Sequence, residues 1–414
     1  MKSDTFLITG RAHVLLTLAF SKLPNLACIG VRDYDARGRR RDGENASWRS
    51  YGWSLNPTEQ RFRSRMSSEP LLPLLLYSLG EASTGPERIE MFLRRDPVPD
   101  RSFDLSPSFM QSKAVPVLSN LRALLLSLDG HWGEDFDSDM HTVPNPSNPD
   151  SGFGCLRRFL QHTPLLEHIR LNFKYTGQGV HVRHADALLA WLGTSPGPDV
   201  NMIPTPVRLD HLTTLELGMI VVAPDTLLDL VSKFAKLEAV SLWKVELQPV
   251  RDSSEEGKFE GQTMWAYYLR KIGEAFQAPE NVKTFMIGWV VEDMSAMHVP
   301  VRFAGKIDVD GNGKITVEDV EDVVKFRKEV GSNVRSWLDG LAKKVFLQEP
   351  IEILSDEDPN PEEWSEDDED DGTPDESEED EIDDDASVDT ETAAAETGLP
   401  IMNCMTLTET PPKT

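Results

Sequence analysis

Residues 209–217 read LDHLTTLEL, with leucine at the first, fourth, seventh and ninth positions. The final residues alternate apolar and polar, which is typical of a β-strand, and the earlier leucines lead into that strand. The same apolar spacing recurs in residues 23–31, 118–126 and 234–242, and in part in residues 166–171 and 282–287. This LxxLxxLxL spacing is the pattern of a leucine-rich repeat, in which each strand belongs to one coil of a solenoid.

Segments with helical apolar spacing lie between these strands, at residues 11–22, 155–161, 185–192, 227–234 and 265–276. Alternating strands and helices favour an α/β fold with a parallel sheet and helices on one side. The steps between strands vary from 25 to about 45 residues, and one standard repeat has about 20–29. We therefore predict an irregular leucine-rich-repeat-like solenoid, with an ordinary α/β sheet as the alternative.

Three regions are expected along the chain. Residues 1–298 form the leucine-rich-repeat-like domain, with long loops near 32–65 and 129–152. Residues 299–348 hold a hairpin and C-terminal helices, and residues 349–414 form a disordered acidic tail. Like charges repel in such a tail and apolar residues are scarce, so it cannot collapse onto a core.

The formal net charge of -28 is concentrated at one end of the chain. Residues 351–414 hold 25 acids and one base, whereas the rest is nearly neutral with 45 acids and 41 bases. A polyanionic tail repels phosphates, so we expect no nucleic-acid partner. No apolar run approaches the roughly 20 residues that a membrane span needs. The three cysteines, Cys28, Cys155 and Cys404, lie far apart, so we expect a reducing compartment, cytoplasmic or nuclear.

Several segments resemble the fungal F-box proteins with leucine-rich-repeat-like bodies. They are LPNL at 23–26, GVRDY at 30–34, RRRDG at 39–43, WRSYG at 48–52, LTTLEL at 212–217, LLDL at 227–230 and LEAVSLWKV at 237–245. In that family an F-box docks to a cullin-type ubiquitin ligase and the repeats select the substrate. The resemblance therefore implies a substrate-recognition role. The 22 residues before Leu23 are too few for an F-box, so we expect none in this sequence.

The sequence predicts a non-enzymatic protein-interaction scaffold. No GxSxG, P-loop, HExxH or strand-linked GxGxxG motif is present. A solenoid presents the strand residues between its core positions on an extended face that grasps another protein. The residues that we expect on this partner-binding face are Arg122, Arg170, Asn172, Glu216 and Trp243.

Residues 308–319, DVDGNGKITVED, resemble the loop of a calcium-binding EF-hand. Calcium prefers oxygen ligands, which would come from Asp308, Asp310, Asn312, the Lys314 carbonyl and Asp319. An exiting helix is expected over about 317–330, but the preceding residues read as a strand. A Ca²⁺ site and a β-hairpin with a Gly-Asn-Gly turn both remain open.

The tail begins with IEILSDED at residues 351–358, which resembles a SUMO-interacting motif. Such a segment adds a strand to a sheet edge through its apolar residues, here Ile351, Ile353 and Leu354, while the acids meet basic residues. The alternative is the apolar end of a helix that runs into the tail.

Overall fold

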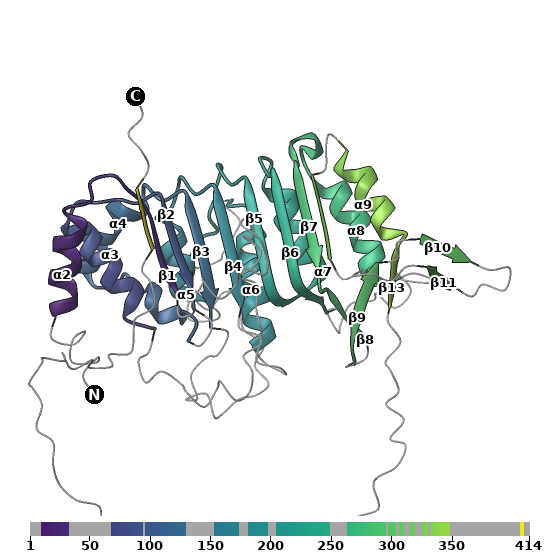
Figure 1. Cartoon of the computed structure of the whole chain (residues 1–414), viewed down its shortest axis with the longest axis horizontal. Coiled ribbons are helices and arrows are strands. Elements are labelled where there is room, and N and C mark those ends of the chain that lie inside the picture. The colour runs from purple at the N-terminus through teal and green to yellow at the C-terminus, as the bar shows by residue number, and fades with distance from the viewer. Residues whose placement is uncertain are drawn as a thin grey trace, which may run out of the picture. The chain divides into compact units, whose positions relative to one another are not determined.

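The structure is a computed structural model of the chain. It describes residues 10–32, 68–93, 96–129, 153–173, 181–197, 204–248, 263–294, 297–303, 306–309, 315–318, 325–329, 333–347 and 406–409 (Figure 1). The expected loops near 32–65 and 129–152 lie almost entirely outside these residues, as do most of residues 349–414.

A parallel sheet forms the centre of the described chain. Seven strands pair side by side in sequence order: β1 (Leu26–Arg32), β2 (Arg88–Phe92), β3 (Ala123–Leu128), β4 (His168–Phe173), β5 (Thr214–Val222), β6 (Ala239–Leu247) and β7 (Thr284–Gly288). One α-helix precedes each strand: α2 (Arg11–Phe20), α3 (Leu71–Glu81), α4 (Ser108–Leu118), α5 (Gly154–Leu160), α6 (His181–Gly193), α7 (Pro224–Lys233) and α8 (Met264–Ala275). Two short 3-10 helices are η4 (Asp100–Phe103) and η5 (Pro279–Asn281). The predicted α/β fold with a mostly parallel sheet is confirmed.

The main core lies between the sheet and its helices, which occupy one side of the strands in Figure 1. Successive strand residues point to opposite faces, so every second residue faces this core. One buried row crosses all seven parallel strands in register, formed by Ile29, Ile89, Leu124, Ile169, Leu215, Val240 and Phe285. These are residues from the strand part of the repeated sequence pattern, with Ile89 added.

The turn into each strand is built in the same way. The amides of Arg122 and Ala123 both donate hydrogen bonds to the carbonyl of Glu87. The same pair of hydrogen bonds to one carbonyl recurs at the entry to each of the next four strands. The lead-in leucines Leu121, Leu212 and Leu237 are buried beneath these turns. The leading apolar residues of the pattern therefore hold the turns onto the core.

The last strands close the far end of the sheet. They are β8 (Val291–Met294), β9 (Met297–Phe303), β12 (Lys325–Glu329) and β13 (Val345–Leu347). β8 continues parallel to β6 and then pairs antiparallel with β9, β13 pairs with β9, and β12 pairs with β7. Helix α9 (Val334–Ala342) packs on α8. Strands β8, β9, β12 and β13 thus extend the sheet, and α9 extends the helix layer, whereas β10 (Lys306–Val309) and β11 (Ile315–Glu318) pair with each other in a separate two-stranded sheet.

Two features of the C-terminal part differ from the sequence prediction. The helix expected at about 317–330 is wrong, because β11 (Ile315–Glu318) and β12 are strands there. In β11, Ile315, Thr316 and Val317 are β-branched and favour extended backbone, and Lys325–Glu329 pairs antiparallel with β7. Within the segment expected to be disordered, β14 (Thr406–Glu409) pairs antiparallel with β1.

Within the described part of the chain, no helix combines the length and the apolar character needed to cross a lipid bilayer.

Candidate partner-binding face of the sheet

One face of the parallel sheet carries no α-helix among the described residues (Figure 1). Apolar residues on it form two small clusters separate from the main core, Trp243 with Met286, and Phe92 with Ala123 and Leu125. We call it the helix-free face, and its polar residues include Arg88, Glu90, His168, Arg170, Asn172, Glu216 and Ser241. A parallel sheet is normally covered on both sides by apolar layers, so charged residues in these rows are unusual.

An ion pair links the central strands of the helix-free face. Arg170 on β4 lies directly opposite Glu216 on β5, and its Nε and Nη2 donate to Glu216 Oε2 at 2.9 and 2.5 Å. His168 Nε2 lies 2.6 Å from the other carboxylate oxygen of Glu216. The carboxylate is thereby held from both sides, so the charges on this face are fixed in position.

A second charged group surrounds Phe92 on β2. The guanidinium carbons of Arg32 and Arg170 lie 5.4 and 5.6 Å from the centre of its ring, within the range of cation–π attraction. Glu90 accepts from Arg32 Nη2 at 3.1 Å and from Arg88 Nε at 2.5 Å. Phe92 thus joins the two ion-paired groups across β1, β2 and β4.

Four of the five residues predicted for partner binding lie on this face. Arg170, Asn172, Glu216 and Trp243 occupy neighbouring rows of β4, β5 and β6. Their exposure is only 1%, 4%, 7% and 5%, respectively. These four side chains therefore point away from the main core, and they are buried on the other side of the sheet.

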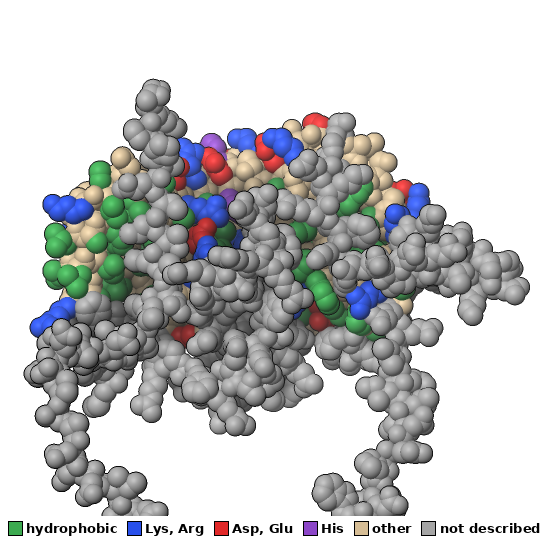
Figure 2. Space-filling view, in the orientation of Figure 1, with side chains coloured by type: hydrophobic (Ala, Val, Ile, Leu, Met, Phe, Trp, Pro, Cys, Tyr) green, Lys and Arg blue, Asp and Glu red, His purple; other side chains and the backbone are tan. Residues whose placement is uncertain are grey.

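The fifth residue, Arg122, lies on the rim where the strands begin. It pairs with Glu167 and, at 3.8 Å, with Glu87, and its side chain is 47% exposed. Further along the same rim Lys283 Nζ lies 2.6 Å from Glu238 Oε2. Figure 2 shows basic and acidic side chains following each other along the upper edge of the sheet. This alternating rim is the accessible charged border of the helix-free face.

A backbone irregularity repeats near the carboxyl ends of three strands. Met219, Lys244 and Trp289 each lie four residues after a member of the buried row that crosses the parallel strands. All three have left-handed φ values, of 54°, 52° and 55°. Such backbone costs non-glycine residues free energy. Trp289, directly after the end of β7, is 46% exposed, so this row includes an accessible aromatic side chain.

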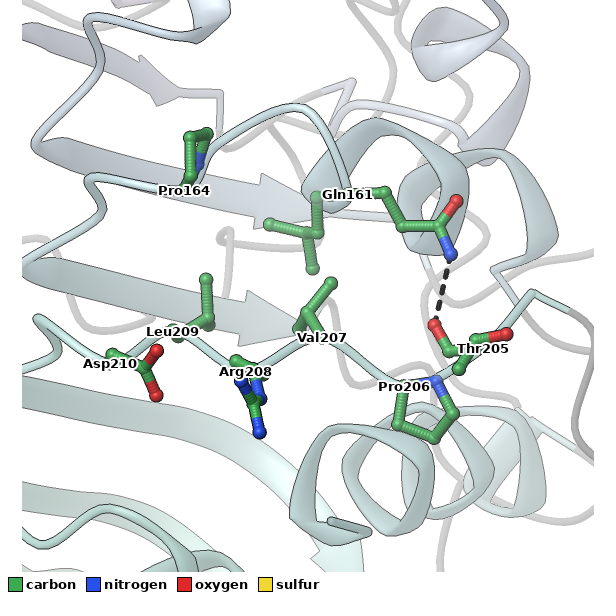
Figure 3. A pocket seen from close by; sticks show the side chains of 9 residues that line it. Gln161, Pro164, Thr205, Pro206, Val207, Arg208, Leu209 and Asp210 are labelled. Carbon is green, nitrogen blue, oxygen red and sulfur yellow. Dashed lines mark hydrogen bonds between the residues drawn. The ribbon is translucent and has the colours of Figure 1, made fainter. Parts of the chain in front are cut away.

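A shallow groove lies elsewhere, between the end of α5 and the segment that leads into β5 (Figure 3). Its volume is about 350 Å³, and Gln161 Nε2 closes one end by donating to the Thr205 carbonyl at 2.9 Å. Arg208 and Asp210 are its only charged lining residues. This groove offers no set of groups for catalysis.

The remaining predicted site residues fall where the structure describes little. Asp308 belongs to β10 (Lys306–Val309), of which only the backbone is described. Outside the described residues lie Asp310, Asn312, Lys314, Asp319, Ile351, Ile353 and Leu354. No group of three or more His, Cys, Asp or Glu side chains suited to a metal ion occurs in the part of the chain that is described.

The sequence interpretation missed the contribution of β2. Arg88, Glu90 and Phe92 alternate with Ile89 and Met91, which is a period-two strand signal. That alternation would have indicated the strand, although it has no leucine lead-in.

Comparison with known proteins finds no matching family model, no matching curated protein and no matching solved structure.

Proposed function

We propose that this chain is a non-enzymatic protein-interaction scaffold, built as an irregular leucine-rich-repeat-like solenoid that reads a partner protein with its helix-free face. The observation that carries the proposal is the arrangement of seven parallel strands in sequence order, each preceded by one helix. The face of the sheet without helices carries charged and aromatic residues. Each strand and its helix correspond to one coil of a solenoid.

The chemistry of the face suits a folded protein partner. Arginine and aromatic side chains are the common anchors of protein interfaces, and the accessible Arg32 and Arg88, which are 28% and 40% exposed, are already oriented by Glu90. Both charge signs follow each other along the rim through Glu87, Arg122 and Glu167. A partner with a complementary row of charges would be aligned along the strand order, which favours specificity.

The resemblance to fungal F-box proteins gives the proposal a cellular setting. In that setting the partner is a protein selected for ubiquitination, and the scaffold is the substrate-recognition part of a cullin-type ligase. Co-purification of ligase components together with the bound partner would support this setting, whereas a partner bound without any ligase component would favour a scaffold of another kind.

Crosslinking of the full-length chain in cells tests the location of the interface. Accessible rim and face positions are changed in one variant, Arg88→Glu/Arg122→Glu, because these side chains are 40% and 47% exposed. The matched control, Lys113→Glu/Lys271→Glu, reverses two charges of similar exposure on the helix side. We expect partner crosslinks to map to the strand side and to be lost in the first variant only. Equal loss in both variants, or crosslinks confined to the helix side, would contradict the proposal.

A further inference from the structure

Helix α2 is apolar on two opposite sides. Its inner residues Ala12 and Phe20 are buried, and Leu16 packs against the core. Its outer residues Val14, Leu15 and Leu18 are 62%, 55% and 57% exposed. A surface helix normally has a polar outer side, and a helix that is apolar all round is normally buried.

The outer apolar residues lie between two basic ones. At 3.6 residues per turn, Arg11, Leu15 and Leu18 follow one another along a single side of α2, and Lys22 lies in the turn directly after the helix ends at Phe20. Neither Arg11 nor Lys22 has an ion-pair partner among the described residues, and α2 itself contains no acid. We call Arg11, Val14, Leu15, Leu18 and Lys22 the α2 stripe. Figure 2 shows hydrophobic side chains gathered at this end of the molecule, with basic side chains above and below them.

The opposite end of the helix layer shows how this chain covers such a side. There, α9 lies along α8 and buries Val334, Leu338 and Leu341. Its Asp339 Oδ1 lies 3.4 Å from Arg270 Nε on α8. The covering element is thus an amphipathic helix that pairs an acid with a base of the terminal helix. Among the described residues no helix lies beyond α2 (Figure 1).

We propose that the α2 stripe binds an amphipathic helix of a partner protein, with apolar residues spaced by three and four and with acids that meet Arg11 and Lys22. The apolar residues supply the burial, and the two unpaired bases select an acidic partner. This surface is separate from the helix-free face, so the scaffold would hold two partners at different places.

A second copy of the chain fits the α2 stripe less well. Three half-exposed aliphatic side chains offer far less than the roughly 800 Å² per partner of a stable protein interface. Two copies would also bring Arg11 and Lys22 of each chain toward like charges. A single acidic helix satisfies both the small apolar area and the two bases.

The test uses the full-length chain and two fluorescent synthetic helical peptides with the same leucine stripe. One peptide carries glutamates beside the stripe and the other carries glutamines, because a lysine peptide would bind the acidic tail. We expect saturable binding in fluorescence anisotropy, at least tenfold tighter for the glutamate peptide. Leu15→Glu/Leu18→Glu should weaken that binding at least tenfold, whereas Leu165→Glu, at another exposed leucine, should leave it unchanged.

A second variant keeps the apolar residues and removes only the charges. In Arg11→Gln/Lys22→Gln the two peptides should bind equally, with unchanged thermal unfolding. The proposal is overturned if the glutamate peptide binds all variants alike or binds none. It is also overturned if Leu15→Glu/Leu18→Glu abolishes self-association in sedimentation, or abolishes binding to anionic phospholipid vesicles, while the peptide does not bind.

Discussion

Arg170 and Glu216 form a largely buried ion pair between neighbouring parallel strands, with two nitrogens of the guanidinium donating to Glu216 Oε2 at 2.9 and 2.5 Å. Their side chains are 1% and 10% exposed. Removing charges from water is costly, and their mutual attraction compensates only when both partners are present. The pair therefore fixes the position of two strands while contributing little net free energy of folding.

Removing one partner of this ion pair should lower the free energy of unfolding far more than removing both partners. We expect Arg170→Leu to lower the free energy of unfolding by about 3–5 kcal/mol, since Glu216 would stay buried without its guanidinium. The double variant Arg170→Leu/Glu216→Leu should recover much of that loss. Urea unfolding of the single and double variants measures the coupling. As a control, Arg122→Leu at the exposed rim should cost no more than about 1 kcal/mol. If the effects of Arg170→Leu and Glu216→Leu alone add up to the effect of the double variant, the pair does not act as a unit.

Glu292 should make stability depend on pH in a defined direction. Burial raises the pKa of Glu292 above its ordinary value of 4.5, although the amides of Trp265 and Met264 donate to it and oppose the rise. The folded state then binds its proton more tightly than the unfolded state, so this contribution to stability is complete below pH 4.5 and is lost as pH rises through the folded pKa.

Glu292→Gln removes that titration. The variant should lose less stability than the wild type as the pH rises above 4.5, as measured by urea unfolding at each pH. A glutamine can still accept the hydrogen bond from the Trp265 amide, which Glu292 accepts at 2.6 Å. An unchanged pH dependence in the variant would mean that Glu292 does not titrate in this range.

Cys155 should be an unreactive thiol in the folded chain. Burial raises its pKa to about 11, and the negative charge of Asp100 adds to the rise. At pH 8 only about one molecule in a thousand would carry the reactive thiolate. We expect iodoacetamide to modify Cys155 slowly in the folded protein and rapidly in urea, followed by mass spectrometry. Rapid modification before unfolding would show that the region around α5 opens in the native state.

The pairing of β14 with β1 should protect the edge of the sheet. Leu407 lies opposite Ile29 and Thr406 opposite Gly30 in an antiparallel register. Deleting residues 402–414 should accelerate amide hydrogen exchange in residues 26–32 about fivefold or more, because hydrogen bonds worth about 1 kcal/mol each are lost. Residues 123–128 in the middle of the sheet should exchange as before. Equal exchange in residues 26–32 with and without the deletion would argue against this pairing.

The repeated spacing carries most of the fold. Where the lead-in leucines are present, as at Leu209 and Leu212 before β5, the pattern locates both the turn and the strand. Three elements lack such a signal. α3 is apolar on nearly every side, α4 contains Pro116, and β2 follows residues 83–87 without an apolar lead-in. These elements owe their form to the core that they complete, which a local pattern does not encode.

The helix-free face was harder to foresee than the core. Alternation places Glu216 and Trp243 on it, but the contacts between Phe92 and Arg170 depend on the register of strands far apart in the sequence. The left-handed backbone at Lys244 occurs at a residue other than glycine, so the sequence does not predict it. Such contacts arise from strand pairing, so they could be found only after the order of the strands was known.

The loop at 308–319 provides a direct choice between a hairpin and a calcium site. Ile315 lies opposite Val309 and Thr316 opposite Asp308 in an antiparallel ladder, and the flanking segments are strands where an EF-hand has helices. Ladder pairing between the first and ninth residues of the loop is the arrangement of a β-hairpin. We therefore expect calorimetric titration of the full-length chain with Ca²⁺ to give no binding heat. Asp308→Ala serves as the control and should give the same trace as the wild type. Saturable heat in the wild type that disappears in Asp308→Ala would establish the cation site, and the hairpin register would then have to change on binding.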